Sequence, residues 1–224
     1  MFSQKFKISN LNVSNKHKSL IIAEIGINHE GNFQRCLKLV DQANQSGADL
    51  VKIQVLNPKK KRIKLFSTFD KENFDFIKKL KPICFKISSS LFYDYFFIKK
   101  IQNENKPLLI STGVVDIKDI EILLKLISKN KNKKIVLMHC RSLYPTPLEK
   151  SNLSRIQFLK NYKNILMGYS DHTKDIRASI ASIHYGAKII EKHFSFDTTR
   201  ANYDHKISLE PKKFLKMVNE IREN

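Results

Sequence analysis

Short runs of apolar, mostly β-branched residues alternate with longer amphipathic stretches along most of this chain. The short runs predict strands, and they lie at 20–25, 50–54, 63–68, 83–88, 107–112, 134–140, 165–170 and 188–194. The amphipathic stretches predict helices, and they lie at 33–46, 71–80, 91–104, 117–129, 151–161, 174–185 and 211–223. Because strands that alternate with helices pair in parallel, this pattern predicts the α/β class and a (β/α)8 TIM barrel.

Two segments depart from a regular alternation. Between the second and third predicted strands lie only residues 55–62, whereas a crossover that contains a helix needs about a dozen residues or more. We therefore expect the barrel to lack helix 2. Residues 1–18 are polar and irregular, which predicts an N-terminal arm or a small hairpin, and we expect residues 19–224 to form one barrel domain.

Three residues mark helix boundaries. Asp116 precedes the stretch at 117–129, whose apolar residues have helical spacing, and it is therefore expected to be the N-cap. Gly47 and Gly186 each follow a predicted helix and precede a predicted strand, which is where glycine commonly ends a helix.

The chain is strongly basic, with a formal net charge of +20 from 41 Lys and Arg against 21 Asp and Glu. The lysines are spread over nearly every segment, as codon bias in an AT-rich genome would produce, and the one dense run, at 59–62, is short. No basic face with interleaved aromatic residues marks a nucleic-acid site, so we expect no nucleic-acid partner. A positive field would still steer anionic substrates towards a cleft.

Nothing in the sequence indicates a membrane segment or secretion. No apolar run approaches the roughly 20 residues that span a bilayer, so we expect no membrane partner. Cys36, Cys84 and Cys140 are odd in number, show no CxxC spacing and come without a signal peptide, which together predict a cytoplasmic protein.

Polar side chains gather where the predicted strands end, which is where TIM-barrel enzymes place their active sites. The residues at or just beyond these ends include Glu24, Asn28, His29, Lys52, Gln54, Thr68, Lys86, Ser89, Ser111, His139, Tyr144, Ser170, His172, Glu191 and His193. The side chains at these positions are the candidates for one functional site.

Two of these candidates, His172 and His193, end neighbouring predicted strands. Two neutral imidazoles at one end of adjacent parallel strands suit a divalent metal ion. The alternative is that each histidine is a hydrogen-bonded residue of the barrel wall.

Lys52, Lys86 and Lys192 lie inside apolar strands, where an amine is costly to bury without an anion. One interpretation is that they form salt bridges with Glu24 and Glu191 inside the barrel. The other is that they form, with neighbouring Ser and Thr hydroxyls, a pocket for a phosphate and a carboxylate. Together with the two histidines, such a pocket would suit polarisation of a carbonyl beside a phosphorylated substrate.

Several segments in order along the chain resemble the sialic acid synthase (N-acetylneuraminate synthase) family, whose relatives make legionaminic, pseudaminic or spore-coat sugar acids. The matching segments are IAEIGINHEG at 22–31, GADLVKIQ at 47–54, FKISS at 85–89, LISTG at 109–113, YPTP at 144–147, GYSDHT at 168–173, EKHF at 191–194 and DHKISLEP at 204–211. The resemblance covers residues from about 20 to 223 and again implies a TIM barrel.

The resemblance implies a transferase that condenses phosphoenolpyruvate with an N-acetylated aminosugar or another aldose, giving a 2-keto sugar acid and phosphate. His172 and His193 would hold Mn²⁺ or Mg²⁺ and, with Glu24 as the residue that manages protons, would be the catalytic residues. The positions that match substrate-binding positions of the family are Lys52, Gln54, Thr68, Lys86, Ser89, Ser111, Tyr144, Ser170 and Asp204.

The chain also departs from the pattern of this family. Residues 67–70 read Ser-Thr-Phe-Asp without the usual proline, Leu91 replaces an acidic residue, and Ser142 stands where Asn is common. The segment after the second strand is short, and the antifreeze-like C-terminal domain of the family is expected to be absent. The part of the site for metal and phosphoenolpyruvate is thus retained, and the part for the sugar is depleted.

These departures leave a second interpretation open. The chain could be a non-catalytic or regulatory paralogue that binds metal or an anion, or that needs a partner chain carrying the missing domain. Loss of helix 2 would also expose apolar barrel surface, which a second subunit could cover, so a homodimer is possible.

Overall fold

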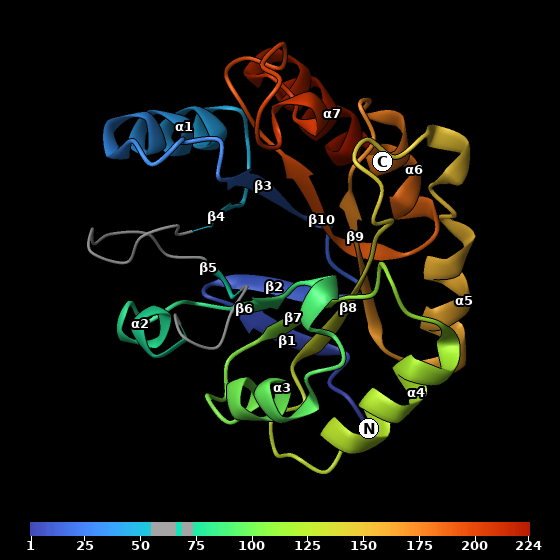
Figure 1. The fold of residues 1–224 in the computed structure, drawn as a ribbon. Helices are drawn as coiled ribbons and strands as arrows, with labels where there is room; N and C mark the ends of the chain where they lie inside the picture. Colours follow the sequence, from blue (N-terminus) through green and yellow to red (C-terminus); the bar gives the residue numbers. More distant parts are fainter. Residues whose placement is uncertain (55–65, 69–73) are drawn as a thin grey trace.

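Eight parallel strands close into a barrel in a computed structural model that describes residues 1–54, 66–68 and 74–224 (Figure 1). The strands follow one another around the barrel in chain order, and β10 closes it by pairing with β3. Their bounds are β3 Leu20–Gly26, β4 Leu50–Ile53, β5 Phe66–Thr68, β6 Phe85–Ile87, β7 Leu108–Ser111, β8 Ile135–His139, β9 Leu166–Asp171 and β10 Ala187–His193. The prediction of a TIM barrel is confirmed.

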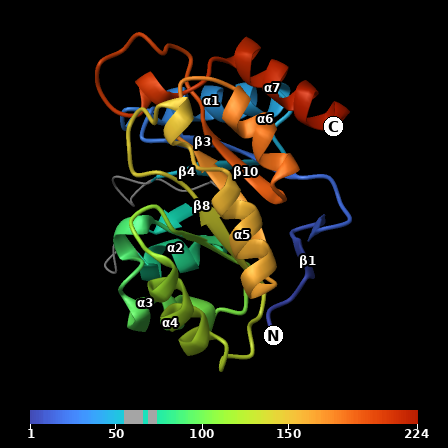
Figure 2. The same cartoon turned by 90° about the vertical axis from the view of Figure 1, so that its right-hand side faces the viewer.

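The helices lie outside the ring of strands (Figure 1 and Figure 2). Their bounds are α1 Phe33–Gln45, α2 Phe74–Lys79, α3 Tyr95–Gln102, α4 Ile117–Ile127, α5 Ser154–Lys163, α6 Arg177–His184 and α7 Pro211–Glu223. Three short 3₁₀ helices stand in the connections, η1 Ser89–Leu91, η2 Leu148–Lys150 and η3 His205–Ile207. None of the helices in the described part of the chain is long and apolar enough to cross a membrane.

The structure confirms the predicted helix boundaries at Asp116, Gly47 and Gly186. Asp116 is the N-cap of α4 and forms a capping box with Asp119, as its position indicated. Gly47 follows α1 with φ +82°, and Gly186 follows α6 with φ +96°, a conformation in which glycine is unstrained. The expected helix at 91–104 begins only at Tyr95, because residues 89–91 form η1 and the Asp94 side chain caps α3 by accepting from the Phe97 amide.

The first 14 residues contain a two-stranded antiparallel hairpin of β1, Lys5–Ile8, and β2, Leu11–Ser14. Its side chains Phe6, Ile8 and Val13 are buried in one cluster with inward-facing barrel residues that include Ile22 and Leu109. The hairpin thus fills the amino-terminal end of the barrel and leaves the opposite end for polar chemistry.

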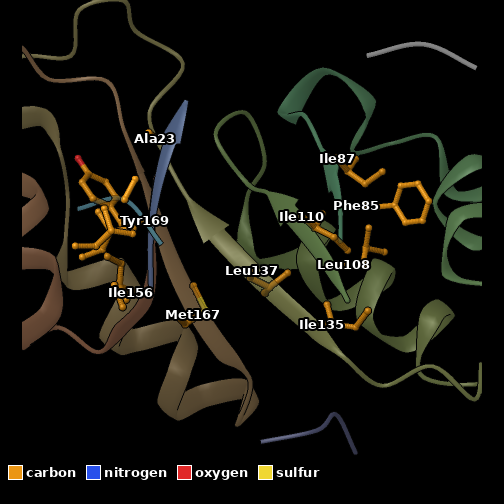
Figure 3. Close-up of a cluster of buried hydrophobic side chains, with 14 of the residues drawn as sticks. Ala23, Phe85, Ile87, Leu108, Ile110, Ile135, Leu137, Ile156, Met167 and Tyr169 are labelled. Carbon is orange, nitrogen blue, oxygen red and sulfur yellow. The ribbon is translucent and has the colours of Figure 1, made fainter. Parts of the chain in front are cut away.

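A second, larger cluster of buried apolar side chains lies between the strands and the helices. Figure 3 shows part of it, with Ile156 of α5 beside Met167 and Tyr169 of β9. On β7 and β8, alternate residues belong to this layer, Leu108 and Ile110 on one strand and Ile135 and Leu137 on the other, because successive side chains point to opposite faces of the sheet. The remaining positions face the barrel interior and determine what the site contains.

The predicted absence of helix 2 falls on residues 55–65, which lie outside the described residues. The described part of β5 pairs with β6 through Phe66↔Phe85, Ser67↔Lys86 and Thr68↔Ile87. The backbone of Thr68 is therefore placed at the end of a barrel strand as expected, whereas the position of its side chain is outside what the structure describes.

Candidate active site

A cavity of about 480 Å³ opens at the carboxyl ends of the barrel strands. Its wall contains eleven of the twelve side chains that the resemblance implies to be catalytic or substrate-binding, and the side chain of the twelfth, Thr68, lies outside the description. They are Glu24, Lys52, Gln54, Lys86, Ser89, Ser111, Tyr144, Ser170, His172, His193 and Asp204. The structure thus brings together residues from seven different strand ends.

The polar lining follows from strand alternation. On β3, Leu20 and Ile22 belong to the cluster above the hairpin, and Glu24, two residues on, lines the cavity. On β7 the same step leads from Leu109 to Ser111. On both strands the inward-facing positions therefore change from apolar to polar towards the carboxyl end, which is where the cavity opens.

The two lysines of the cavity are paired with carboxylates. Lys86 Nζ lies 2.7 Å from Glu191 Oε1, and Lys52 Nζ lies 2.9 Å from Glu191 Oε2. Lys52 also forms an ion pair with Glu24, its register partner on the neighbouring strand. Ser170 donates to Glu191 Oε1 at 2.8 Å. Of the two interpretations of these lysines, the salt bridges are present, and they lie on the wall of the cavity that the second interpretation requires.

Burial and charge act against each other in this cluster. Burial lowers the pKa of Lys52 to about 7, although the carboxylate of Glu191 opposes the shift. Burial alone would raise the pKa of Glu191, but the charges of Lys52 and Lys86 hold it well below its ordinary range. Lys52 can therefore exchange a proton near neutral pH, whereas Glu191 stays ionised.

The two histidines lie near each other at the ends of the neighbouring strands β9 and β10, with ring centroids 5.6 Å apart and ring planes tilted by 53°. His172 Nδ1 donates to the Arg141 carbonyl oxygen at 2.7 Å, which leaves Nε2 with its lone pair, and the ring of Tyr144 stacks on His172 at 4.3 Å. Burial lowers the pKa of His172 to about 4. Burial is the main cause that lowers the pKa of His193 well below its ordinary value, and the nearby His172 and Lys52 lower it further. Both imidazoles are therefore neutral at pH 7.

Two neutral imidazoles with available nitrogens suit a divalent metal ion. Among the described residues, His193 Nδ1 is buried without a hydrogen-bond partner, and it lies 3.6 Å from Asp204 Oδ2. Within the described residues, no group of three or more His, Cys, Asp or Glu side chains is arranged to hold a metal. The donor set thus fits an open site, in which His172 and His193 would hold an ion and substrate or water would supply further ligands.

Asp204 reaches the cavity from the segment after β10, and a buried asparagine holds its backbone. Asn28 Oδ1 accepts from the Asp204 amide at 3.2 Å, and Asn28 Nδ2 donates to the Phe194 carbonyl and to Ser208 Oγ, each at 3.0 Å. Burial raises the pKa of Asp204. Asn28 follows the first predicted strand, and its position at a strand end does not by itself predict a role. The structure shows that it anchors the segment that carries Asp204.

Lys192 does not belong to the cavity, which corrects the grouping of three strand lysines. It alternates with Glu191 and His193, which face inward, and its amine instead lies 3.1 Å from Asp171 Oδ2 on the outer side of the strands. Because side chains alternate between the two faces of a strand, the sequence already predicts that Lys192 points away from the cavity when Glu191 and His193 line it.

Leu91, where the resemblance leads us to expect an acidic residue, packs against the apolar cluster between strands and helices. Cys140, in contrast, lines the cavity beside Ser89, with Sγ 3.4 Å from the serine Oγ. Cys140 was not among the residues predicted to line the site. Its position two residues after Met138, an inward-facing residue of β8, is the signal that could have placed it.

Comparisons with known proteins agree with this geometry. Residues 58–224 match the NeuB family. The N,N'-diacetyllegionaminic acid synthase of Campylobacter jejuni is 34% identical over 92% of this chain and 76% of its own length. The pseudaminic acid synthase of the same species is 30% identical over 95% of this chain and 75% of its own length.

The fold has a similar counterpart among solved structures. The N-acetylneuraminic acid (sialic acid) synthetase of Leptospira borgpetersenii, solved in complex with citrate, superposes with a TM-score of 0.91 at 29% identity. The superposition covers 99% of this chain and 89% of that one. The similarity thus includes the whole barrel described above.

Proposed function

This chain belongs to the NeuB family, and from that premise we propose that it is a synthase that condenses phosphoenolpyruvate with an N-acetylated aminosugar or another aldose. The products would be a 2-keto sugar acid of the sialic, legionaminic or pseudaminic type and phosphate. The observation that carries the proposal is the single cavity in which two neutral imidazoles stand beside two lysines and a buried glutamate.

The lysines would bind the anionic substrate. A phosphate or carboxylate that enters the cavity meets Lys52, Lys86 and the hydroxyls of Ser89, Ser111 and Ser170. Because Glu191 already neutralises part of the lysine charge, the incoming anion would be held by hydroxyl and amine donors together rather than by net charge alone. The positive field of the chain would raise the rate of encounter.

His172 and His193 would hold Mn²⁺ or Mg²⁺, which as a Lewis acid would polarise the aldehyde of the open-chain sugar. Tyr144, stacked on His172, and Gln54 would orient the sugar, together with Asp204 beside His193. These three residues lie in the segments that follow the strands, where side chains can differ among relatives without changing the barrel.

Glu24 and Lys52 would manage protons. The enol carbon of phosphoenolpyruvate bonds to the aldehyde carbon, whose oxygen takes a proton, and water adds to the carbon that bears the phosphate. Glu24 is buried, and Lys52 is its one ion-pair partner among the described residues, so it would accept the proton of that water. Lys52, with a pKa of about 7, would return a proton as phosphate leaves by C–O cleavage.

Phosphate release tests the proposal. The protein with phosphoenolpyruvate and Mn²⁺ is assayed across a panel of N-acetylated aminosugars and simple aldoses. We expect release with at least one sugar, its loss in His172→Ala/His193→Ala, and its retention in His184→Ala, which alters an exposed residue at the end of α6. Binding of both ligands without turnover on any sugar would instead support the non-catalytic paralogue, which the apolar packing of Leu91 favours.

A further inference from the structure

Three nitrogen donors converge on one carboxylate oxygen outside the cavity. Glu30 Oε1 accepts from Arg200 Nη1 and lies 3.2 Å from His205 Nε2 and 3.6 Å from Arg35 Nη2. The His205 side chain is fully buried, and Ser195 Oγ lies 2.7 Å from its Nδ1. Glu30 comes from the connection after β3, whereas Arg200 and His205 come from the connection after β10, so this carboxylate joins two segments that lie about 170 residues apart in the chain.

The backbone of Glu30 adopts a conformation that glycine would accommodate better. Its φ is +53°, in the left-handed region, and Gly31 follows at +73°. A residue with a Cβ is strained there, and glycine is not. A glutamate at this position therefore costs stability, which the contacts of its carboxylate with Arg200 and His205 help to offset.

The segment that Glu30 holds leads directly into the cavity. Residues 195–205 follow the metal-binding candidate His193, and their far end carries Asp204. Within the segment, the Asp197 carboxylate accepts from the Thr199 amide at 2.9 Å and pairs with Arg200. Glu30 is not among the residues that line the cavity, so its effect on the chemistry would be indirect, through the residues that it contacts.

We propose that Glu30 is a positioning residue that fastens residues 195–205 to the connection after β3 and thereby holds the Asp204 carboxylate beside His193. The effect on the sugar reaction rests on the proposed function, whereas the fastening itself does not. Asn28 fixes the backbone of Asp204, and Glu30 fixes the loop that precedes it, so the two act on the same carboxylate from different points.

Replacement by glycine removes the carboxylate without adding backbone strain, so it tests the role of the carboxylate alone. Glu30→Gly removes the acceptor and relieves the strain, so the melting temperature should not fall markedly, while residues 195–205 lose their anchor. We expect amide hydrogen exchange in that segment to accelerate at least about tenfold, because a charge-assisted hydrogen-bond network is lost. The kcat/KM for the acceptor sugar should fall by about tenfold or more, with the affinity for phosphoenolpyruvate changed by less than about twofold.

Two further variants make the test specific. Lys81→Gly is the matched control, because Lys81 has φ +51°, is exposed and lies away from the cavity; it should change neither exchange in residues 195–205 nor kinetics. Glu30→Gln keeps an oxygen acceptor for Arg200 and His205 without the charge, and it should fall between wild type and Glu30→Gly in both measurements.

The outcomes distinguish the two claims. Faster exchange confined to residues 195–205 supports the fastening even if the wild-type protein releases no phosphate, in which case only the proposed function fails. Unchanged exchange in Glu30→Gly overturns the fastening. Faster exchange throughout the barrel also overturns it, because Glu30 would then stabilise the fold as a whole rather than position one segment.

Discussion

The buried carboxylate Glu191 offers a quantitative test of how the cavity is held together. Its side chain is 3% exposed and lies between Lys86 Nζ at 2.7 Å and Lys52 Nζ at 2.9 Å. The informative perturbation is a double-mutant cycle of Glu191→Gln and Lys86→Met, because the two single variants each leave a charge that the double variant removes.

The magnitude follows from the distance and the burial. At 2.7 Å and an effective dielectric constant of about 20, the Glu191–Lys86 attraction amounts to about 6 kcal/mol before desolvation. Desolvation of both ions offsets much of it, whereas removal of a single partner from a buried pair costs about 3–5 kcal/mol. We expect Glu191→Gln to lose about this much and Lys86→Met to lose less, since Lys52 still pairs with Glu191. The double variant should be more stable than the sum of the single effects by about 1–3 kcal/mol.

Urea denaturation followed by far-ultraviolet circular dichroism measures the four free energies of unfolding. The exposed pair Lys216–Glu220 on α7, 3.8 Å apart, is the matched control. Because solvent screens such a pair, its coupling in the cycle Lys216→Met/Glu220→Gln should stay below about 0.5 kcal/mol. A Glu191–Lys86 coupling equally small would refute the reasoning, since the two charges would then not depend on each other for burial.

Three further variants test other parts of the account. Burial lowers the pKa of His139 to about 4, so between this value and 6.5 the unfolded chain binds the extra proton and the free energy of unfolding falls as the pH falls. His139→Gln should remove up to about 1.4 kcal/mol per pH unit of this dependence. If urea denaturation gave the same change in the free energy of unfolding between about pH 7 and pH 5 in both proteins, the prediction would be contradicted. In Gly168→Ala the new Cβ would stand 2.7 Å from the Ile189 carbonyl oxygen, so we expect a loss of about 1–3 kcal/mol in urea unfolding, and an unchanged midpoint would argue against this packing. Asp116→Ala removes the capping box of α4 and should cost about 1 kcal/mol in the same measurement, whereas an effect near zero would mean that the cap is not needed.

The strands and helices were predictable because each is encoded locally. Apolar β-branched runs predicted all eight strands, Asp116 predicted the start of α4, and Gly47 predicted the end of α1. The start of α3 was missed because a 3₁₀ turn is short and carries no periodicity of its own; only the capping contact of Asp94 distinguishes it.

The gathering of the site residues was predictable for the same reason, since carboxyl ends of parallel strands meet at one end of a barrel. The partners of the lysines were not, because a lysine can pair with a protein carboxylate or a substrate anion and the sequence alone does not choose. The strand register that sets Glu24 against Lys52 makes that choice. The contact between Glu30 and His205 joins two connections far apart in the chain, so no local sequence pattern predicts it.

Isothermal titration of phosphoenolpyruvate into Mn²⁺-loaded protein tests the central claim most directly, namely that this cavity binds an anionic substrate beside a metal ion. We expect wild type to bind phosphoenolpyruvate, Lys86→Ala to lose that binding, and His172→Ala/His193→Ala to lose Mn²⁺ binding while His184→Ala retains both. If wild type binds neither ligand, or if Lys86→Ala binds phosphoenolpyruvate as tightly as wild type, the cavity is not the site proposed for it.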